Sequence, residues 1–415
     1  MRQMKDSEIE WVREIPKDWE VHPIYYFFAE RKNKNKLGKE RNLLSLSYGR
    51  VISKDINTRE GLLPENYNGY NIVEKDDIVL RLTDLQNDKR SLRTGYIKEH
   101  GILTSAYVTL KPIRKIDSRF FHYVLHSYDT LKVFYNMGNG VRQGLNYDEL
   151  SKCKLIAAPF SEQKIIANYL DKQCAEIDAL IADIQAEIDT LEQYKRSVIT
   201  EAVTKGLNPN AEMIDCDIDY LGKMNKSWTL TKLGYICTKL DRPVLKEAPP
   251  LICSNKGKVI LRGDENIGLS TDNDNMFQGV KAGDLCIHGM DTWHGAIAVS
   301  DLEGKITNVV HCCDSNEDKR FIAYFLQMLA FKKVYKAISN GVRGNTSDFR
   351  SWDKASSIYI VIPSNSEQKK IADYIDEKCA QTEQIINEKQ SQIDTLESYK
   401  KSVIFEYVTG KKEVI

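Results

Sequence analysis

Two segments of the chain have the hydrophobic spacing of long amphipathic helices. In residues 161–205, apolar or small side chains recur in alternating steps of four and three: Leu170, Cys174, Ile177, Ile181, Ile184, Ile188 and Leu191. This spacing is the a/d seam of a coiled coil. Residues 366–415 repeat it more weakly, because Thr382 and Lys389 are polar. The pattern predicts two long helices that pack as a coiled coil, and the alternative is two helices docked separately on their own domains.

The ends of both helices are also marked in the sequence. Ser161 and Ser366 follow shortly after a proline and are expected to be N-caps, while Gly206 and Gly410 follow the last turns. A helix of 44 residues, the length of residues 161–204, would span about 66 Å at 1.5 Å per residue.

The chain contains an internal duplication. Residues 161–204 align without gaps on residues 366–409, and more than half of the aligned positions are identical. Shorter blocks recur in the same order in both halves: 4–19 with 213–228, Asp77 with Asp284, 119–125 with 320–326, and 139–142 with 340–343. Such self-similarity predicts two copies of one architectural unit. We expect a globular domain in residues 1–160, a helix in 161–205, a second domain in 206–365 and a second helix in 366–415.

The globular segments have the pattern of α+β domains. Short β-branched or alternating runs predict strands near 77–82, 106–111 and 154–158, and near 284–288, 295–300 and 358–362. One long amphipathic helix is expected in each domain, at 119–136 and 319–338. The fold class is therefore α+β, with two mixed domains alternating with two helices in a pseudo-two-fold arrangement.

Charge changes this picture only when it is divided along the chain. The 59 basic and 59 acidic residues cancel. Residues 1–160 have a basic surplus, however, that the acidic helical segments hide, so zero net charge does not exclude a nucleic-acid partner. No apolar run reaches the roughly 18 residues that span a bilayer, and the charged start lacks a signal-peptide core. We expect a cytoplasmic protein.

No catalytic or metal-binding motif stands out. The sequence has no GxxxxGK[ST] phosphate loop, no glycine-rich cofactor fingerprint and no Asn-Pro-Pro-aromatic motif of adenine methyltransferases. The nine cysteines are scattered, and His122 and His126 have zinc spacing without a third ligand nearby. We expect no catalytic residue, no bound metal and no bound cofactor.

Candidate DNA contacts lie in polar, basic stretches. The segment Arg31-Lys32-Asn33-Lys34-Asn35-Lys36 interleaves cations with amides, which contact phosphates and base edges, and Arg81 and Arg93 flank a second basic loop. A solvated run of charges is the alternative interpretation. Glycine-rich loops carry Arg142 and Gln143 in the first copy, and Arg343 and Asn345 in the second. A structural turn would also explain these loops, but not the recurrence of arginine after Gly-Val in both copies.

The repeated helices are the expected sites for protein partners. Identical surfaces bind identical subunits, so a duplicated segment suits two copies of one partner. The basic pairs near the helix ends, Lys195 with Arg196 and Lys400 with Lys401, are the candidate partner-binding residues.

At these residues the chain resembles the DNA-specificity subunits of type I restriction-modification systems. The resemblance covers the full length and rests on MKDSEIEW...IPKDW, PFSEQK.IA.YLD, YKRSVI.EAVTKGLNPN and the second SEQKKIADYID...LESYKKSVI. It departs from the family pattern at 223–226, where Lys-Met-Asn-Lys replaces the Glu-Ile-Pro-Lys of residues 14–17.

The resemblance implies two target-recognition domains that read a two-part, asymmetric DNA site. It implies a non-catalytic chain that positions two adenine-N6 methyltransferase (modification) subunits, which use S-adenosylmethionine. Motor and nuclease (restriction) subunits, which use ATP and Mg²⁺, join them. Two alternatives remain at this stage: a coiled-coil scaffold without a DNA role, and a specificity module of another bipartite methyltransferase system. A fused nuclease or methyltransferase has no supporting motif.

Overall fold

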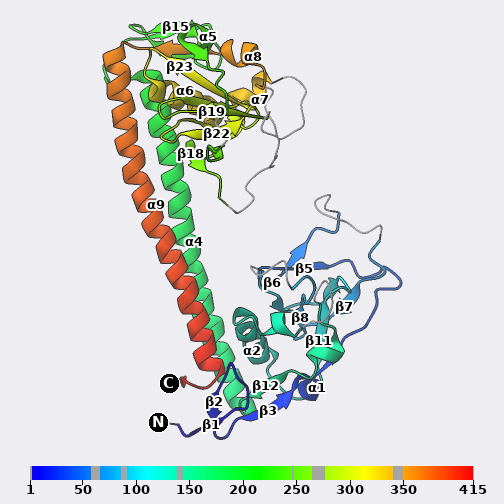
Figure 1. Cartoon of the computed structure of the whole chain (residues 1–415). Helices are drawn as coiled ribbons and strands as arrows, with labels where there is room; N and C mark the ends of the chain where they lie inside the picture. Colours follow the sequence, from blue (N-terminus) through cyan, green and yellow to red (C-terminus); the bar gives the residue numbers. More distant parts are fainter. Residues whose placement is uncertain are drawn as a thin grey trace. The chain divides into compact units, whose positions relative to one another are not determined.

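The chain forms two compact units. The computed structural model describes residues 2–57, 66–85, 91–137, 144–244, 247–263, 276–339 and 349–414. The first unit comprises Met1–Ile184 with Ser391–Ile415, and the second comprises Gln185–Gln390. Each unit therefore holds one α+β domain, part of helix α4 (Phe160–Lys205) and part of helix α9 (Asn365–Val408) (Figure 1). The predicted fold class is confirmed.

The first domain consists of short strands with one longer helix. Its elements are β1 (Met4–Asp6), β2 (Glu14–Pro16), β3 (Glu20–Pro23), α1 (Ile24–Phe27), β4 (Phe28–Glu30), β5 (Leu43–Ser47), β6 (Arg50–Lys54), β7 (Asn71–Val73), β8 (Ile78–Leu80), β9 (Thr94–Tyr96), β10 (Gly101–Leu103), β11 (Val108–Pro112), α2 (Ser118–Thr130), the 3₁₀ turn η1 (Val133–Asn136), α3 (Tyr147–Leu150) and β12 (Lys154–Ala157).

The second domain has the corresponding series. Its elements are β13 (Met213–Asp215), β14 (Lys223–Asn225), β15 (Thr229–Lys232), α5 (Leu233–Ile236), β16 (Cys237–Lys239), β17 (Leu251–Ser254), β18 (Lys258–Leu261), β19 (Phe277–Val280), β20 (Leu285–His288), η3 (Thr292–His294), β21 (Ile297–Val299), β22 (Gly304–Thr307), β23 (Val310–Ser315), α6 (Lys319–Phe331), α7 (Val334–Ile338), α8 (Trp352–Ser356) and β24 (Tyr359–Ile362).

The two domains share one strand order. The sheet β4-β11-β8-β9 of the first corresponds to β16-β23-β20-β21 of the second, and the pair β3-β12 corresponds to β15-β24. A close backbone approach recurs as well: a Cβ at Gly101 would lie 2.5 Å from the carbonyl oxygen of Asn42, and one at Gly304 would lie 2.4 Å from that of Pro249. The duplication seen in the sequence is therefore a duplication of the fold.

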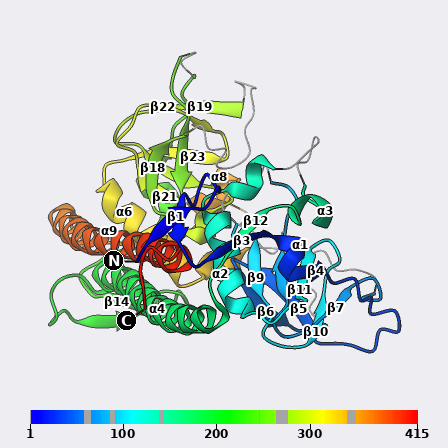
Figure 2. The same cartoon turned by 90° about the horizontal axis from the view of Figure 1, so that it is seen from below.

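Helices α4 and α9 lie side by side and antiparallel within each unit (Figures 1 and 2). In the first unit the rings of Tyr169 and Tyr407 are 4.4 Å apart, and Asp178 lies 2.7 Å from Lys400. In the second, Lys195 lies 2.7 Å from Glu383, and Glu187 pairs with Lys389. In both units the α9 partner has a lower number as the α4 residue number rises, as antiparallel packing requires.

The predicted seam is the contact face. Leu170, Cys174, Ile177 and Ile188 are buried, as are Ile375, Cys379 and Ile393. The polar seam residue Thr382 is also buried, and its hydroxyl donates to the carbonyl of Lys378 at 2.8 Å, which satisfies it within its own helix. No described helix is long and apolar enough to cross a membrane.

Each domain packs on its helices through one internal helix. The α2 residues Phe120 and Phe121 share a hydrophobic core with Leu170 of α4 and Ile404 of α9, and the α6 residue Phe321 shares the second core with Ile199 and Ile375. Strand β9 covers α2, and β21 covers α6. The domain is thus anchored to both long helices of its unit.

Two local predictions need correction. Helices α4 and α9 begin at Phe160 and Asn365, so Ser161 and Ser366 lie inside the first turn rather than at the N-cap. The predicted domain helices also end early, because Lys132 and Lys333 adopt left-handed φ angles of +62° and +59°, and shorter helical turns follow. Gly206 and Gly410 end the long helices with φ of +77° and +68°, as predicted.

Candidate nucleic-acid interface

The basic segment of the first domain forms an ordered loop beside strand β7. The amide of Ile72 donates to the carbonyl of Asn33 at 2.6 Å, and the amide of Asn35 donates to that of Tyr70 at 2.9 Å. The side chain of buried Asn35 closes the loop, because it donates to the carbonyl of Glu40 at 3.0 Å and accepts from the Glu40 amide at 3.2 Å. This closure presents the loop tip, residues 36–39, to solvent.

The lysines of this loop differ in their exposure and in their polar contacts. Lys36 and Lys39 are exposed at the tip, beside Gly38 with φ of +59°. Lys32 is 72% exposed but lies 2.7 Å from Glu30, and Lys34 donates to the carbonyl of Gly69 at 2.9 Å. The tip lysines are therefore the ones best placed for contact with a polyanion.

Arg31 has a structural partner. Its guanidinium donates to the carboxylate of buried Asp77 at 2.9 Å, and burial raises the pKa of Asp77 while Arg31 opposes that rise. Arg242 pairs with Asp284 at the corresponding place in the second domain. The sequence matched the two aspartates but placed Arg31 among the DNA contacts. The recurrence of the pair indicates a role in holding the domain together.

Arg93 is buried rather than exposed. Its side chain donates to the hydroxyl of Tyr135 at 3.0 Å and to the carbonyl of Thr83 at 2.8 Å. It also donates to the backbone carbonyl of Arg81, and Arg81 itself is half-buried. A base contact needs an accessible guanidinium, so the structure corrects the expectation for Arg93: it organises the loop instead of facing DNA.

Four predicted base-reading residues, Arg142, Gln143, Arg343 and Asn345, lie outside the described residues. Their DNA contact stays a prediction.

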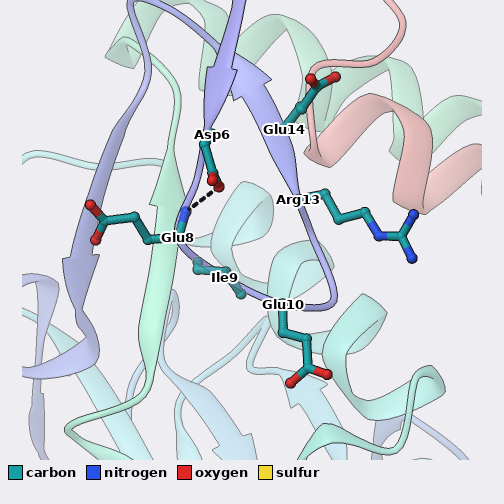
Figure 3. Close-up of a pocket in the computed structure, with 6 residues that line it drawn as sticks. All are labelled: Asp6, Glu8, Ile9, Glu10, Arg13 and Glu14. Atoms are coloured by element: carbon teal, nitrogen blue, oxygen red, sulfur yellow. Dashed lines mark hydrogen bonds between the residues drawn. The ribbon is translucent and has the colours of Figure 1, made fainter.

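A hollow in the first unit has the wrong charge for DNA. It has a volume of about 410 Å³ and lies at the turn between β1 and β2, lined by Asp6, Glu8, Ile9, Glu10, Arg13 and Glu14 (Figure 3). The Asp6 carboxylate accepts from the amide of Glu8 at 2.8 Å. Four carboxylates beside one arginine would repel a phosphate backbone, so this surface is not a candidate DNA contact.

The basic pairs predicted to bind partners are partly occupied within the chain. The Lys195 and Lys400 side chains are only 18% and 23% exposed, and each neutralises a carboxylate on the other long helix. Arg196 is exposed but lies 5.6 Å from the ring of Phe331, while Lys401 is exposed. A role of these four residues in partner binding stays a prediction.

Sequence reasoning missed a set of duplicated polar contacts. The indole of Trp19 donates to Glu162 at 3.0 Å, and that of Trp228 donates to Glu367 at 3.2 Å. Asp178 and Glu383 occupy equivalent helix positions and accept from Lys400 and Lys195. The signal was present, since all these residues occupy matching positions of the repeat.

Two α+β domains with one strand order, each packed on an antiparallel helix pair, define an internally duplicated protein. Residues 16–190 match the family model described as the type I restriction modification DNA specificity domain. The match covers most of the first domain and part of α4, so this part of the chain is similar to a DNA-specificity domain of type I restriction-modification systems.

The chain is also similar to solved structures, the first of which shares its fold. A chain described under "complex assembly and conformational transition of the type I R-M system" aligns with a TM-score of 0.66 and 10% identity, covering 96% of this chain and 99% of that one. The specificity subunit from Thermoanaerobacter tengcongensis aligns at 0.45 and 11%, covering 96% and 98%. The subunit from M. genitalium aligns at 0.38 and 14%, covering 94% and 96%. No curated protein matches the chain significantly.

Proposed function

We propose that the chain is a non-catalytic DNA-specificity subunit, which reads a two-part, asymmetric DNA site and holds two adenine-N6 methyltransferase subunits on it. The first domain would read one half-site and the second domain the other, with the antiparallel helices setting the spacing. The methyltransferase subunits would supply S-adenosylmethionine chemistry, and ATP- and Mg²⁺-dependent restriction subunits would join them in the cytoplasm. This chain would bind no cofactor.

The observation that carries the proposal is that the two domains share one architecture but differ in their surface loops. The sheets, the Arg-Asp pairs and the Trp-Glu contacts recur in both domains. The loop at 31–42, however, carries exposed lysines at its tip, whereas the corresponding stretch of the second domain contains Pro243, Pro249 and Pro250. Two domains with unlike loops suit two unlike half-sites, because base edges are read by individual side chains.

Exposed apolar side chains on the long helices support docking of two identical partners. In the first unit Leu180 and Tyr399 are 52% and 54% exposed, and in the second the equivalent Ile385 and Tyr194 are 42% and 48% exposed. Leu180 and Ile385 each precede a seam residue, whereas Asp178 and Glu383 follow one and pair with Arg50 and Lys258 of their domains. At 100° per residue these positions lie on opposite flanks of the seam, so the apolar side chains face away from the domain.

Two equivalent apolar surfaces suit two copies of one partner. We assign them to the modification subunits, in preference to Lys195 and Lys400, because those lysines are already engaged between the helices.

Selection from a random duplex pool tests the function. The chain would be purified with its modification subunits and used to retain DNA, which is then sequenced. We expect enrichment of two separated clusters of fixed bases with a constant gap. Retention without enriched sequence would favour the scaffold interpretation.

A further inference from the structure

One β-hairpin of the first domain reaches both long helices of its unit. Arg50, the first residue of β6, lies 2.5 Å from one carboxylate oxygen of Asp178 on α4. The other oxygen of Asp178 accepts from Lys400 of α9 at 2.7 Å. A single carboxylate thus joins the domain, the first helix and the second helix.

The second unit has the same arrangement built from different residues. Lys258, the first residue of β18, lies 2.6 Å from one oxygen of Glu383, and Lys195 lies 2.7 Å from the other. Lysine replaces arginine, and glutamate replaces aspartate, yet each acid still divides its two oxygens between a hairpin cation and a helix lysine. We call these two groups the hairpin nodes: Arg50, Asp178 and Lys400, and Lys258, Glu383 and Lys195.

Both hairpin tips are seated against the helix of their own domain. Gly49, with φ of +77°, lies near α2, where an added Cβ would make an ordinary contact of 3.7 Å with His126. Gly257, with φ of +69°, approaches α6, where an added Cβ would lie 2.5 Å from Gln327. The left-handed turn therefore brings the following cation to the acid on the long helix in each unit.

The other end of the first hairpin joins the candidate DNA-binding loop. Strand β5 begins at Leu43, directly after the basic loop, and pairs with β10 at Ile102. The Asn42 side chain donates to the carbonyl of His100 at 2.6 Å and accepts from the hydroxyl of Ser53 at 3.2 Å, which fixes the hairpin base. A five-residue strand is about 17 Å long, so the hairpin links the loop to the helices as a short strut.

We propose that Arg50 and Lys258 are positioning residues that hold each DNA-reading surface at a fixed orientation on the helix pair. The inference rests on the proposed function and deepens it. The long helices set the distance between half-sites. The hairpin nodes limit how far each domain can tilt, and so they limit binding to sites with a spacer of another length. Removing a hairpin cation therefore relaxes the choice of spacer and leaves both half-site sequences unchanged.

Methylation mapping of Arg50→Gln, Lys258→Gln and the double variant, each with modification subunits, tests this inference. The readout is methylation at sites with correct half-sites and a spacer one base pair longer or shorter, relative to sites with the preferred spacer. We expect this ratio to rise about 1.5- to 5-fold per variant, the range typical of a partly exposed ion pair. Arg50→Lys, which copies the second node, should restore the parental ratio.

Lys75→Gln is the matched control, because Lys75 is exposed in the same domain and the charge change is identical. Unchanged spacer preference in the double variant, with methylation at preferred sites retained, would overturn the inference and leave the proposed function intact. An equal rise in Lys75→Gln would also overturn it, since the effect would then follow net charge. Failure of the proposed function looks different, because the parental chain would then give no two-part site.

Discussion

The indole N–H of Trp19 donates to Glu162 at 3.0 Å and so joins the start of the domain to the first turn of α4. The same ring covers the end of α9, where a Cβ on Gly410 would lie 3.2 Å from it. Trp228 repeats both contacts with Glu367 and Gly206. In each unit, one buried tryptophan therefore contacts both the first turn of one long helix and the end of the other.

Trp19→Ala should destabilise the first unit by about 3 to 5 kcal/mol, the usual cost of emptying a buried aromatic site. Trp19→Phe should cost less, because it keeps most of the apolar contact and loses the hydrogen bond. Thermal unfolding of both variants checks this. Trp228→Phe is the matched change in the second unit, and equal melting of Trp19→Ala and the parent would contradict the assigned role.

Asp129 should make stability fall as pH rises from about 4 to about 6. Burial raises its pKa to about 6, although the amide of Arg93 donates to it. Because the folded state holds this proton more tightly than the unfolded state, stability is greatest below the unfolded pKa near 4 and declines until the folded pKa is passed. The loss amounts to at most about 3 kcal/mol.

The measurement is the difference in unfolding free energy between the parent and Asp129→Asn across this pH window, which removes the contribution of other carboxylates. The exposed Asp183→Asn serves as control. A difference that does not change with pH would show that Asp129 has an ordinary pKa.

The basic loop should contribute phosphate contacts mainly through its tip. Replacing Lys36 and Lys39 with Gln should lower the slope of log affinity against log salt by about 0.9 for each lost contact. Lys32→Gln should change it less, because Lys32 already lies 2.7 Å from Glu30. Fluorescence titrations of DNA binding at several salt concentrations would check this. Slopes equal to that of the parent for all variants would show that DNA does not contact this loop.

The apolar helix surfaces should bind modification subunits independently of the ion pairs beside them. Leu180→Asp should remove one bound subunit and Ile385→Asp the other, with little change in melting temperature because both side chains are about half exposed. Lys195→Glu should instead lower the melting temperature, because it would place a second carboxylate beside that of Glu383. Native mass spectrometry with melting separates these effects, and full assembly of the doubly substituted chain would refute the placement.

The sequence predicted the architecture well because periodicity and repetition are properties of whole segments. The burial of Leu170 and Ile375 followed from the seam. Individual arginines were less predictable. An arginine in a polar loop has the same sequence signature whether it faces DNA or, like Arg93, turns inward to bind carbonyl groups of that loop. The pairing of Arg31 with Asp77 depends on two strands meeting, which spacing along the chain does not reveal.

Base reading by Arg142 and Arg343 should be specific to one half-site each. Replacing either with Ala should cost about 1 to 3 kcal/mol at its own half-site and relax the consensus only there. A lower melting temperature with an unaltered consensus would instead assign these arginines to the fold.

The most direct test of the account is a map of methylated adenines in DNA modified by the complex of this chain with its modification subunits, obtained by single-molecule sequencing. We expect one motif with two unlike parts, a spacer of constant length between them and one modified adenine in each part. A single uninterrupted motif, or two identical halves, would contradict the claim that the two domains read two different half-sites.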